Sequence, residues 1–224
     1  MEQELNRILT DEAKKLGIFL GPAAQSRFSL FYDEFQVWNA KMNLTAVDAG
    51  PSFVIRHFID SLQVLPLIPQ EAKRLLDLGT GGGFPGIPLK ISRDDLCLTL
   101  LDSSRKKTSF LRQVVLGLGL SDTRVITGRA EEEVREGRGG GEFDVVVSRA
   151  AFKMAQILEL GVHFVTAGGL IIAMKGRDVT EELEKAQTVI HRFHLRLVER
   201  RETILPRSGG ERTLLVYKKN RLRF

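Results

Sequence analysis

The stretch LLDLGTGGGFPGIPL, residues 75–89, places an apolar strand before a cluster of glycines and, after Pro85, an apolar-periodic helix. Glycines let the backbone turn sharply and lie against a flat ligand, because they have no Cβ. Gly81, Gly83 and Gly86 also have the spacing of a dinucleotide-binding fingerprint. The loop therefore predicts a nucleotide-cofactor site, and by itself it fits a nicotinamide dinucleotide as well as S-adenosylmethionine.

Strand and helix patterns alternate from residue 73 onward, which predicts an α/β fold with helices on both faces of a mostly parallel sheet. Several strands are continuously apolar, as strands buried on both faces are. A predicted helix at 178–191 is followed by two alternating strands, which indicate a closing antiparallel hairpin. The expected strands are 74–78, 97–101, 123–127, 143–148 and 169–174, then 194–203 and 212–218 for the hairpin.

The first third of the chain is predicted to be helical. Residues 2–42 carry apolar side chains at helical spacing in two helices, and 52–65 forms a third. We expect residues 1–70 to form a helical segment packed on a catalytic domain of residues 71–224. Its expected core side chains are Trp38 and Phe58, and Leu30 and Val37 are among the apolar positions that indicate the second helix.

Composition describes an ordinary globular chain of 224 residues, with 43% hydrophobic and 27% charged residues. Leu160–Met174 is the longest uncharged stretch, and its 15 residues fall short of the ~20 that a membrane span needs. We therefore predict a cytoplasmic protein without membrane association. Cys97 is the only cysteine, which excludes an internal disulfide, and we expect it in the core of a strand. No histidine spacing suggests a metal site.

Positive charge is concentrated at the C-terminal end. Residues 200–224 contain eight Lys or Arg and two Glu, while the whole chain has a net charge of +5. Such an end suggests a polyanionic partner such as nucleic acid, although a solvated basic tail has the same composition.

Three positions at predicted strand ends are candidates for cofactor contacts. Asp102 follows the second strand, where an acid commonly accepts the ribose hydroxyls of a nucleoside, or caps the next helix. Ala130 and Glu131 follow the third strand, where they can address an adenine edge, or Glu131 can be a first-turn helix acid. Arg149 ends the fourth strand and suits a carboxylate, a phosphate or an interdomain ion pair.

The candidate reaction centre at the end of the fourth strand, residues 147–151, lacks the groups of two other methyl-transfer reactions. It carries neither the Asn-Pro-Pro-Tyr motif typical of transfer to an exocyclic base amine nor the cysteine nucleophile needed for transfer to a pyrimidine carbon. Before the sheet lies a polar set that folding alone does not require, although a hydrogen-bonded helix interface also explains it. This set consists of Asn43, Arg56, His57 and Asp60.

Taken in order, these motifs resemble the bacterial small-subunit ribosomal RNA methyltransferase G family, also called glucose-inhibited division protein B. The resemblance rests on Trp38-Asn39, Asn43-Leu44-Thr45, Arg56-His57, Asp60-Ser61, 77–88, Leu101-Asp102-Ser103, Ser148-Arg149-Ala150, Lys175-Gly176 and Gly210-Glu211-Arg212. It implies a Rossmann-like class I methyltransferase that moves a methyl group from S-adenosylmethionine to N7 of one guanine in 16S ribosomal RNA. The cofactor contacts implied are Gly79, Gly81, Phe84, Asp102, Ala130, Glu131 and Arg149.

Guanine N7 carries no proton, so its methylation needs no general base, and Arg149 is expected to position cofactor or RNA. The expected partner is 16S ribosomal RNA or the small ribosomal subunit, bound by a monomer. Candidate RNA contacts are Asn43, Arg56, His57, Lys175, Arg207 and Arg212, with Lys106, Lys107 and Arg112 as further basic candidates. A nicotinamide-dependent reductase and a non-catalytic RNA-binding protein are the alternative functions.

Overall fold

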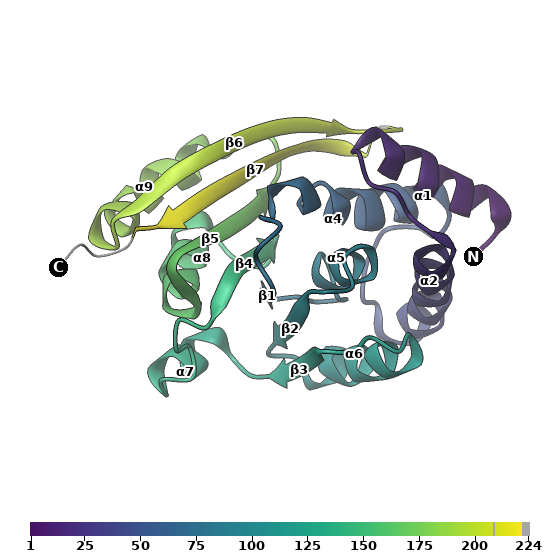
Figure 1. Cartoon of the computed structure of the whole chain (residues 1–224), viewed down its shortest axis with the longest axis horizontal. Helices are drawn as coiled ribbons and strands as arrows, with labels where there is room; N and C mark the ends of the chain where they lie inside the picture. Colours follow the sequence, from purple (N-terminus) through teal and green to yellow (C-terminus); the bar gives the residue numbers. More distant parts are fainter. Residues whose placement is uncertain (208, 221–224) are drawn as a thin grey trace.

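The computed structural model of the chain describes residues 1–207 and 209–220. Seven strands form one sheet in the order β3-β2-β1-β4-β5-β7-β6 (Figure 1). Neighbouring strands from β3 to β5 are parallel, and β7 is antiparallel to both β5 and β6. The strands are β1 (Arg74–Leu78), β2 (Cys97–Asp102), β3 (Thr123–Thr127), β4 (Phe143–Arg149), β5 (Val165–Lys175), β6 (Leu195–Leu205) and β7 (Gly210–Lys219).

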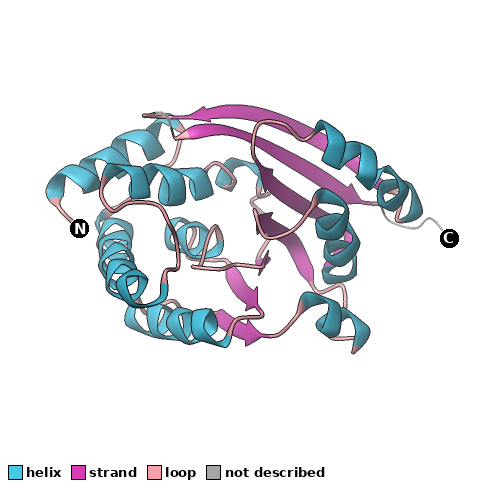
Figure 2. Cartoon of the chain, turned by 180° about the vertical axis from the view of Figure 1, so that it is seen from behind, coloured by secondary structure: helices cyan, strands magenta, loops and turns pink. Residues whose placement is uncertain are grey.

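Helices cover both faces of this sheet (Figures 1 and 2). One face packs against α1 (Gln3–Lys15), α2 (Pro22–Met42), α5 (Gly86–Ser92) and α6 (Arg105–Gly117). The other face packs against α7 (Ala130–Arg135), α8 (Met154–Phe164) and α9 (Thr180–Arg192). Successive strand residues belong to opposite layers: Leu75 lies in the first core and Leu76 in the second.

The predicted α/β fold with its C-terminal antiparallel hairpin is confirmed. The hairpin strands are longer than predicted and meet at the turn between Leu205 and Gly210. Ser208 of that turn, and Arg221 and Arg223 of the basic end, lie outside the described residues.

The predicted helix at 52–65 is interrupted. It consists of α3 (Pro51–Phe53), the π-helical turn η1 (Val54–Ile59) and α4 (Asp60–Leu62), followed by the 3₁₀ turn η2 (Leu65–Leu67). A π turn is wider than an α turn and often occurs at functional sites. Here it contains Arg56 and His57, two of the predicted site residues.

An aromatic cluster joins the N-terminal helices to the glycine loop. The Phe58 ring lies 4.9 Å from Phe28 and 5.7 Å from Phe31, and Phe31 lies 5.3 Å from Phe84, measured between ring centroids. These four side chains are at most 3% exposed. The segment 1–70 therefore shares one continuous core with the sheet and supports the loop from below.

One predicted core position is wrong. Cys97 is exposed because it begins β2 at the amino end of the sheet, outside the covering helices. Leu30 and Val37 are 51% and 55% exposed, on the outer side of α2. Trp38 is half-buried, with its ring 5.6 Å from that of Phe110. Helical spacing identified α2 correctly but did not separate its inner from its outer apolar residues.

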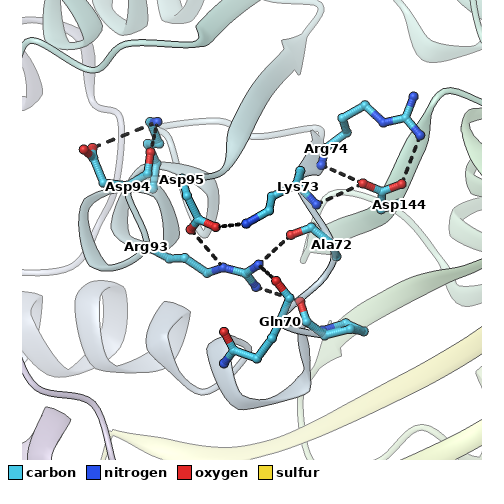
Figure 3. Close-up of polar contacts among 10 residues, drawn as sticks. Gln70, Ala72, Lys73, Arg74, Arg93, Asp94, Asp95 and Asp144 are labelled. Carbon is cyan, nitrogen blue, oxygen red and sulfur yellow. Dashed lines mark hydrogen bonds and ion pairs between the residues drawn. The ribbon is translucent and has the colours of Figure 1, made fainter.

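The amino edge of the sheet is held by charged contacts (Figure 3). Arg93 donates to the carbonyls of Gln70 and Ala72, at 2.5 and 2.6 Å. Lys73 pairs with Asp95, and Arg74 with Asp144. These contacts fix the entry to β1, whose other end leads into the glycine loop.

We predict that Phe58→Ala lowers the free energy of unfolding by about 3–5 kcal/mol, because it leaves a cavity between the N-terminal helices and the glycine loop. Val37→Ala, at an exposed position of α2, is the matched control and should change this free energy by less than about 0.5 kcal/mol. Urea unfolding measures both. Equal effects of the two substitutions would contradict the shared core.

Candidate functional site

A cleft of about 1490 Å³ opens where the parallel strands end. Its wall includes the glycine loop after β1, the end of β2, the turn after β3 and the loop after β4. In open α/β sheets this is the edge at which ligands bind. All residues predicted to contact the cofactor line it: Gly79, Gly81, Phe84, Asp102, Ala130, Glu131 and Arg149.

Two glycines of the loop combine a positive φ with no room for a side chain. Gly79 has a φ of +73°, and a Cβ there would lie 2.5 Å from the Cβ of Ala151. Gly83 has a φ of +91°, and its Cβ would lie 2.5 Å from Cδ1 of Ile87. The loop therefore needs glycine both for its left-handed backbone and for close packing.

Asp77 holds the loop from inside the sheet, a role that the sequence analysis did not assign. Its Oδ2 accepts hydrogen bonds from Gly86 N at 2.8 Å and from Thr80 Oγ1 at 2.7 Å. Oδ1 is buried without a partner among the described residues. Burial raises the pKa of this carboxyl to about 6, although both hydrogen bonds oppose the rise. The sequence does contain a signal for this role, because Asp77 is an acid inside an otherwise apolar strand.

Asp102 holds the loop from the neighbouring strand. Its Oδ2 accepts from Gly81 N at 2.9 Å, and its Oδ1 accepts from Ser104 N at 2.8 Å, just before α6. The N-cap of α6 is Ser104, whose Oγ accepts from Lys107 N, so the prediction that Asp102 caps this helix is wrong. Each carboxylate oxygen has two lone pairs, so Asp102 retains capacity for a ligand hydroxyl.

Ala130 and Glu131 form the first turn of α7 at the cleft wall. Ala130 is buried, whereas Glu131 is exposed and accepts a hydrogen bond from Gln156 Nε2 at 2.9 Å. Glu131 therefore combines the helix-start role with a position on the cleft.

Arg149 lies at the centre of a buried polar cluster. Its Nη1 donates to Asp60 Oδ2 at 3.1 Å and to the Arg56 carbonyl at 3.0 Å, while its guanidinium lies 5.0 Å from the Phe84 ring centroid. Burial lowers the pKa of Arg149, and the charge of Asp60 opposes that shift. Asp60 Oδ1 also accepts from Arg212 Nε at 2.9 Å. The ion-pair alternative for Arg149 is therefore present in the structure.

His57 is a neutral member of this cluster. Arg149 Nη2 lies 3.0 Å from His57 Nδ1, and because arginine only donates, Nδ1 must accept. The proton then sits on Nε2, which lies 3.1 Å from Thr45 Oγ1. Burial lowers the pKa of His57 to about 3, and three nearby arginines add to the effect. His57 is therefore no cation for phosphate at neutral pH.

The other predicted RNA contacts divide into two groups. Arg56, Lys175 and Arg212 line the cleft together with His57, but Lys175 is buried and pairs with Glu182 at 2.7 Å. Asn43 and Arg207 are exposed and do not line it. Of the further basic candidates, Lys107 lines the cleft, whereas Lys106 and Arg112 do not.

Much of the basic C-terminal end is compensated within the protein. Arg200 pairs with Glu202, and Arg201 pairs with Glu199. Lys219 donates to backbone carbonyls at the end of α8 and the start of β5. Net charge alone therefore overstated the free cations on the hairpin.

Within residues 1–207 and 209–220, no group of three His, Cys, Asp or Glu side chains is placed to hold a metal ion. No helix in the same part of the chain combines the length and apolar character needed to cross a membrane.

The sheet order, the reversed β7 and the cleft over a glycine loop define the fold of S-adenosylmethionine-dependent methyltransferases. A solved O-methyltransferase from Bacillus cereus, in complex with S-adenosylhomocysteine, superposes with a TM-score of 0.63 over 86% of this chain and 91% of its own, at 21% identity. A family model described as rRNA small subunit methyltransferase G matches residues 24–202. The chain belongs to this family, which confirms the resemblance.

Two curated relatives are both named Ribosomal RNA small subunit methyltransferase G. The protein from Syntrophus aciditrophicus is 40% identical over 96% of this chain and 89% of its own length. The protein from a Thermoanaerobacter species is 38% identical over 98% and 92%.

We predict a stability signature for neutral His57. Its pKa lies at about 3 in the folded chain and at ~6.5 in the unfolded chain. Below pH ~6.5 only the unfolded chain takes up this proton, so the free energy of unfolding falls with decreasing pH, by at most about 1.4 kcal/mol per pH unit. His57→Gln removes this contribution. The difference in the free energy of unfolding between wild type and variant should therefore decrease as the pH is lowered.

Urea unfolding at about pH 7, 6 and 5 measures this difference, with His191→Gln on the exposed side of α9 as the control. If the difference in the free energy of unfolding between wild type and His57→Gln does not change with pH, the pKa of His57 is the same in the folded and the unfolded chain.

Proposed function

We propose that this chain transfers a methyl group from S-adenosylmethionine to N7 of a specific guanine in 16S ribosomal RNA. It acts as a cytoplasmic monomer, on the free RNA or on the small ribosomal subunit. Family membership supports the substrate class. The observation that carries the reaction is that every predicted cofactor residue lines one cleft, in which both nitrogens of His57 are engaged in hydrogen bonds.

The cleft fits an adenosylmethionine. Gly81 lines it with a φ of +58° and open space where a Cβ would lie, and the Asp102 carboxylate beside it keeps lone pairs for a hydroxyl. Ala130 and Glu131 would address the adenine, Asp102 the ribose hydroxyls, and Gly79, Phe84 and Arg149 the methionyl part. When bound, the cofactor supplies an electrophilic methyl group on a sulfonium.

The chain contributes positioning. Guanine N7 has a lone pair in the ring plane and no proton to remove, so no side chain needs to act as a base. Holding this lone pair in line with the methyl group can supply ~7–11 kcal/mol of the barrier.

Arg149 must not oppose the positive charge that develops on the base. Asp60 pairs with Arg149 and also with Arg212, so it offsets part of the charge of Arg149, and the Arg149 guanidinium lies against Phe84. We therefore assign Arg149 a positioning role toward the methionyl part, with no proton transfer.

We predict that the purified chain transfers labelled methyl from S-adenosylmethionine to 16S RNA or small subunits, and that the label is N7-methylguanine at one position. Borohydride reduction followed by aniline cleavage maps the site. Transfer to another atom would overturn the assignment, and an absence of transfer to both substrates would favour a non-catalytic RNA-binding protein. A thermal shift with nicotinamide dinucleotides and none with S-adenosylhomocysteine would favour a reductase.

We predict that Asp102→Ala weakens S-adenosylhomocysteine binding roughly 10- to 100-fold, because hydrogen bonds of a charged group are worth about 1.5–3 kcal/mol. The loss combines ribose contacts with the support of Gly81. Calorimetry measures the affinity, and Asp11→Ala on the exposed side of α1 serves as the control. An unchanged affinity would remove Asp102 from the cofactor site.

We predict that Arg149→Ala lowers both cofactor affinity and the methylation rate, because the cluster of Asp60, His57 and Phe84 loses its central cation. Melting temperature and S-adenosylhomocysteine affinity are measured alongside activity. If the folded variant keeps both its affinity and its rate, Arg149 has no positioning role.

A further inference from the structure

Four cations of the cleft wall form no salt bridge with an acid among residues 1–207 and 209–220. They are Arg56, Lys107, Arg129 and Lys153. Arg56, Arg129 and Lys153 are exposed and Lys107 is half-buried, so all four are accessible to solvent. Two of them, Arg129 and Lys153, were not singled out by any sequence motif.

The acids of the cleft are already engaged elsewhere. Asp60 pairs with Arg149 and Arg212, and Glu182 pairs with Lys175. Asp102 accepts from two backbone N–H groups, and Glu131 accepts from Gln156. Within the described part of the chain, none of the four cations lies within 4.0 Å of a carboxylate oxygen. The amino edge of the sheet differs, since Lys73 and Arg74 are both paired there (Figure 3).

The cofactor does not explain this charge. The cleft is lined by seven Lys or Arg and four Asp or Glu, an excess of three positive charges with His57 neutral. S-adenosylmethionine carries one carboxylate, one ammonium and one sulfonium, and is itself positive. A positive wall therefore serves a second, anionic ligand.

The helix that carries Lys107 also indicates an anionic ligand. Arg105, Lys106 and Lys107 form the first turn of α6, which has no acid, whereas α7 and α9 begin with glutamates. Cations at a helix N-terminus are unfavourable with the helix dipole. Folding alone does not favour three of them there, and an anion beside them offsets the repulsion.

We infer that Arg56, Lys107, Arg129 and Lys153 form a phosphate-binding rim that holds the RNA strand on both sides of the target guanine. This inference rests on the proposed function. A base that reacts inside the cleft must leave its stack, while its flanking phosphates stay outside. The rim residues come from η1, α6, the turn before α7 and the residue before α8. Figure 1 shows α6, α7 and α8 beside the parallel strands.

The test compares two double variants with the same change in net charge. Arg129→Gln with Lys153→Gln removes two rim cations, and Lys73→Gln with Arg74→Gln removes two paired cations at the opposite edge. RNA affinity is measured by filter binding over a range of salt concentrations, with S-adenosylhomocysteine affinity and melting temperature alongside.

We expect the rim variant to bind 16S RNA roughly 10- to 50-fold more weakly at about 0.1 M salt, and to reduce the slope of log affinity against log salt by about 1.4–1.8. Its S-adenosylhomocysteine affinity stays within about twofold of wild type, because the rim does not hold the cofactor. The opposite-edge variant keeps the wild-type slope. Arg56→Gln with Lys107→Gln should reproduce the rim effect from the other two segments.

Equal slopes of log affinity against log salt for wild type and both rim variants would overturn the proposed phosphate-binding rim. Equal losses in rim and opposite-edge variants would also overturn it, because net charge would then explain the effect. If polyglutamate competes for binding as strongly as RNA at equal charge, RNA is not the specific ligand of the rim, and the inference would be overturned. If wild type transfers no methyl group but the rim variants still lose RNA affinity, the proposed reaction fails while the rim stands.

Discussion

The glycine loop after β1 can serve as a ligand surface only because two carboxylates hold it. Asp77 binds it from below through Thr80 and Gly86, and Asp102 binds it from the side through Gly81. Glycine conformational freedom is costly to restrict, and these contacts restrict it with charged acceptors inside a packed sheet. The aromatic cluster beneath Phe84 then fixes the loop relative to the N-terminal helices.

A second carboxylate arrangement organises the other side of the cleft. Asp60 gives one oxygen to Arg149 and the other to Arg212, and so connects a helix, a central strand and the closing hairpin. The π turn η1 places the Arg56 carbonyl and His57 Nδ1 against the same guanidinium. The cleft thus has a neutralised interior, suited to a cationic cofactor, and an uncompensated positive rim, suited to a polyanion.

Local pattern was sufficient for the architecture. Alternating strands and helices, the glycine loop and the acid after the second strand predicted the sheet, the cleft and the residues that line it, because each depends on neighbours in the chain. Cys97 was misplaced because burial depends on which elements cover a strand end. Helical spacing alone also did not show that Leu30 and Val37 lie on the outer side of α2. The π turn also escaped prediction, since its apolar spacing resembles that of an ordinary helix.

The amino-acid sequence thus specifies the fold class, the family and the cofactor loop, since periodicity and motif spacing are properties of the chain itself. Which charges remain free is a property of the folded molecule. Asp60 meets Arg149 across 89 residues and Arg212 across 152, so no window of sequence contains either pair. Folding neutralises His57, pairs several C-terminal arginines with acids, and leaves Arg129 and Lys153 without a salt bridge among the described residues. Ion pairing and desolvation depend on distances that exist only in the packed structure.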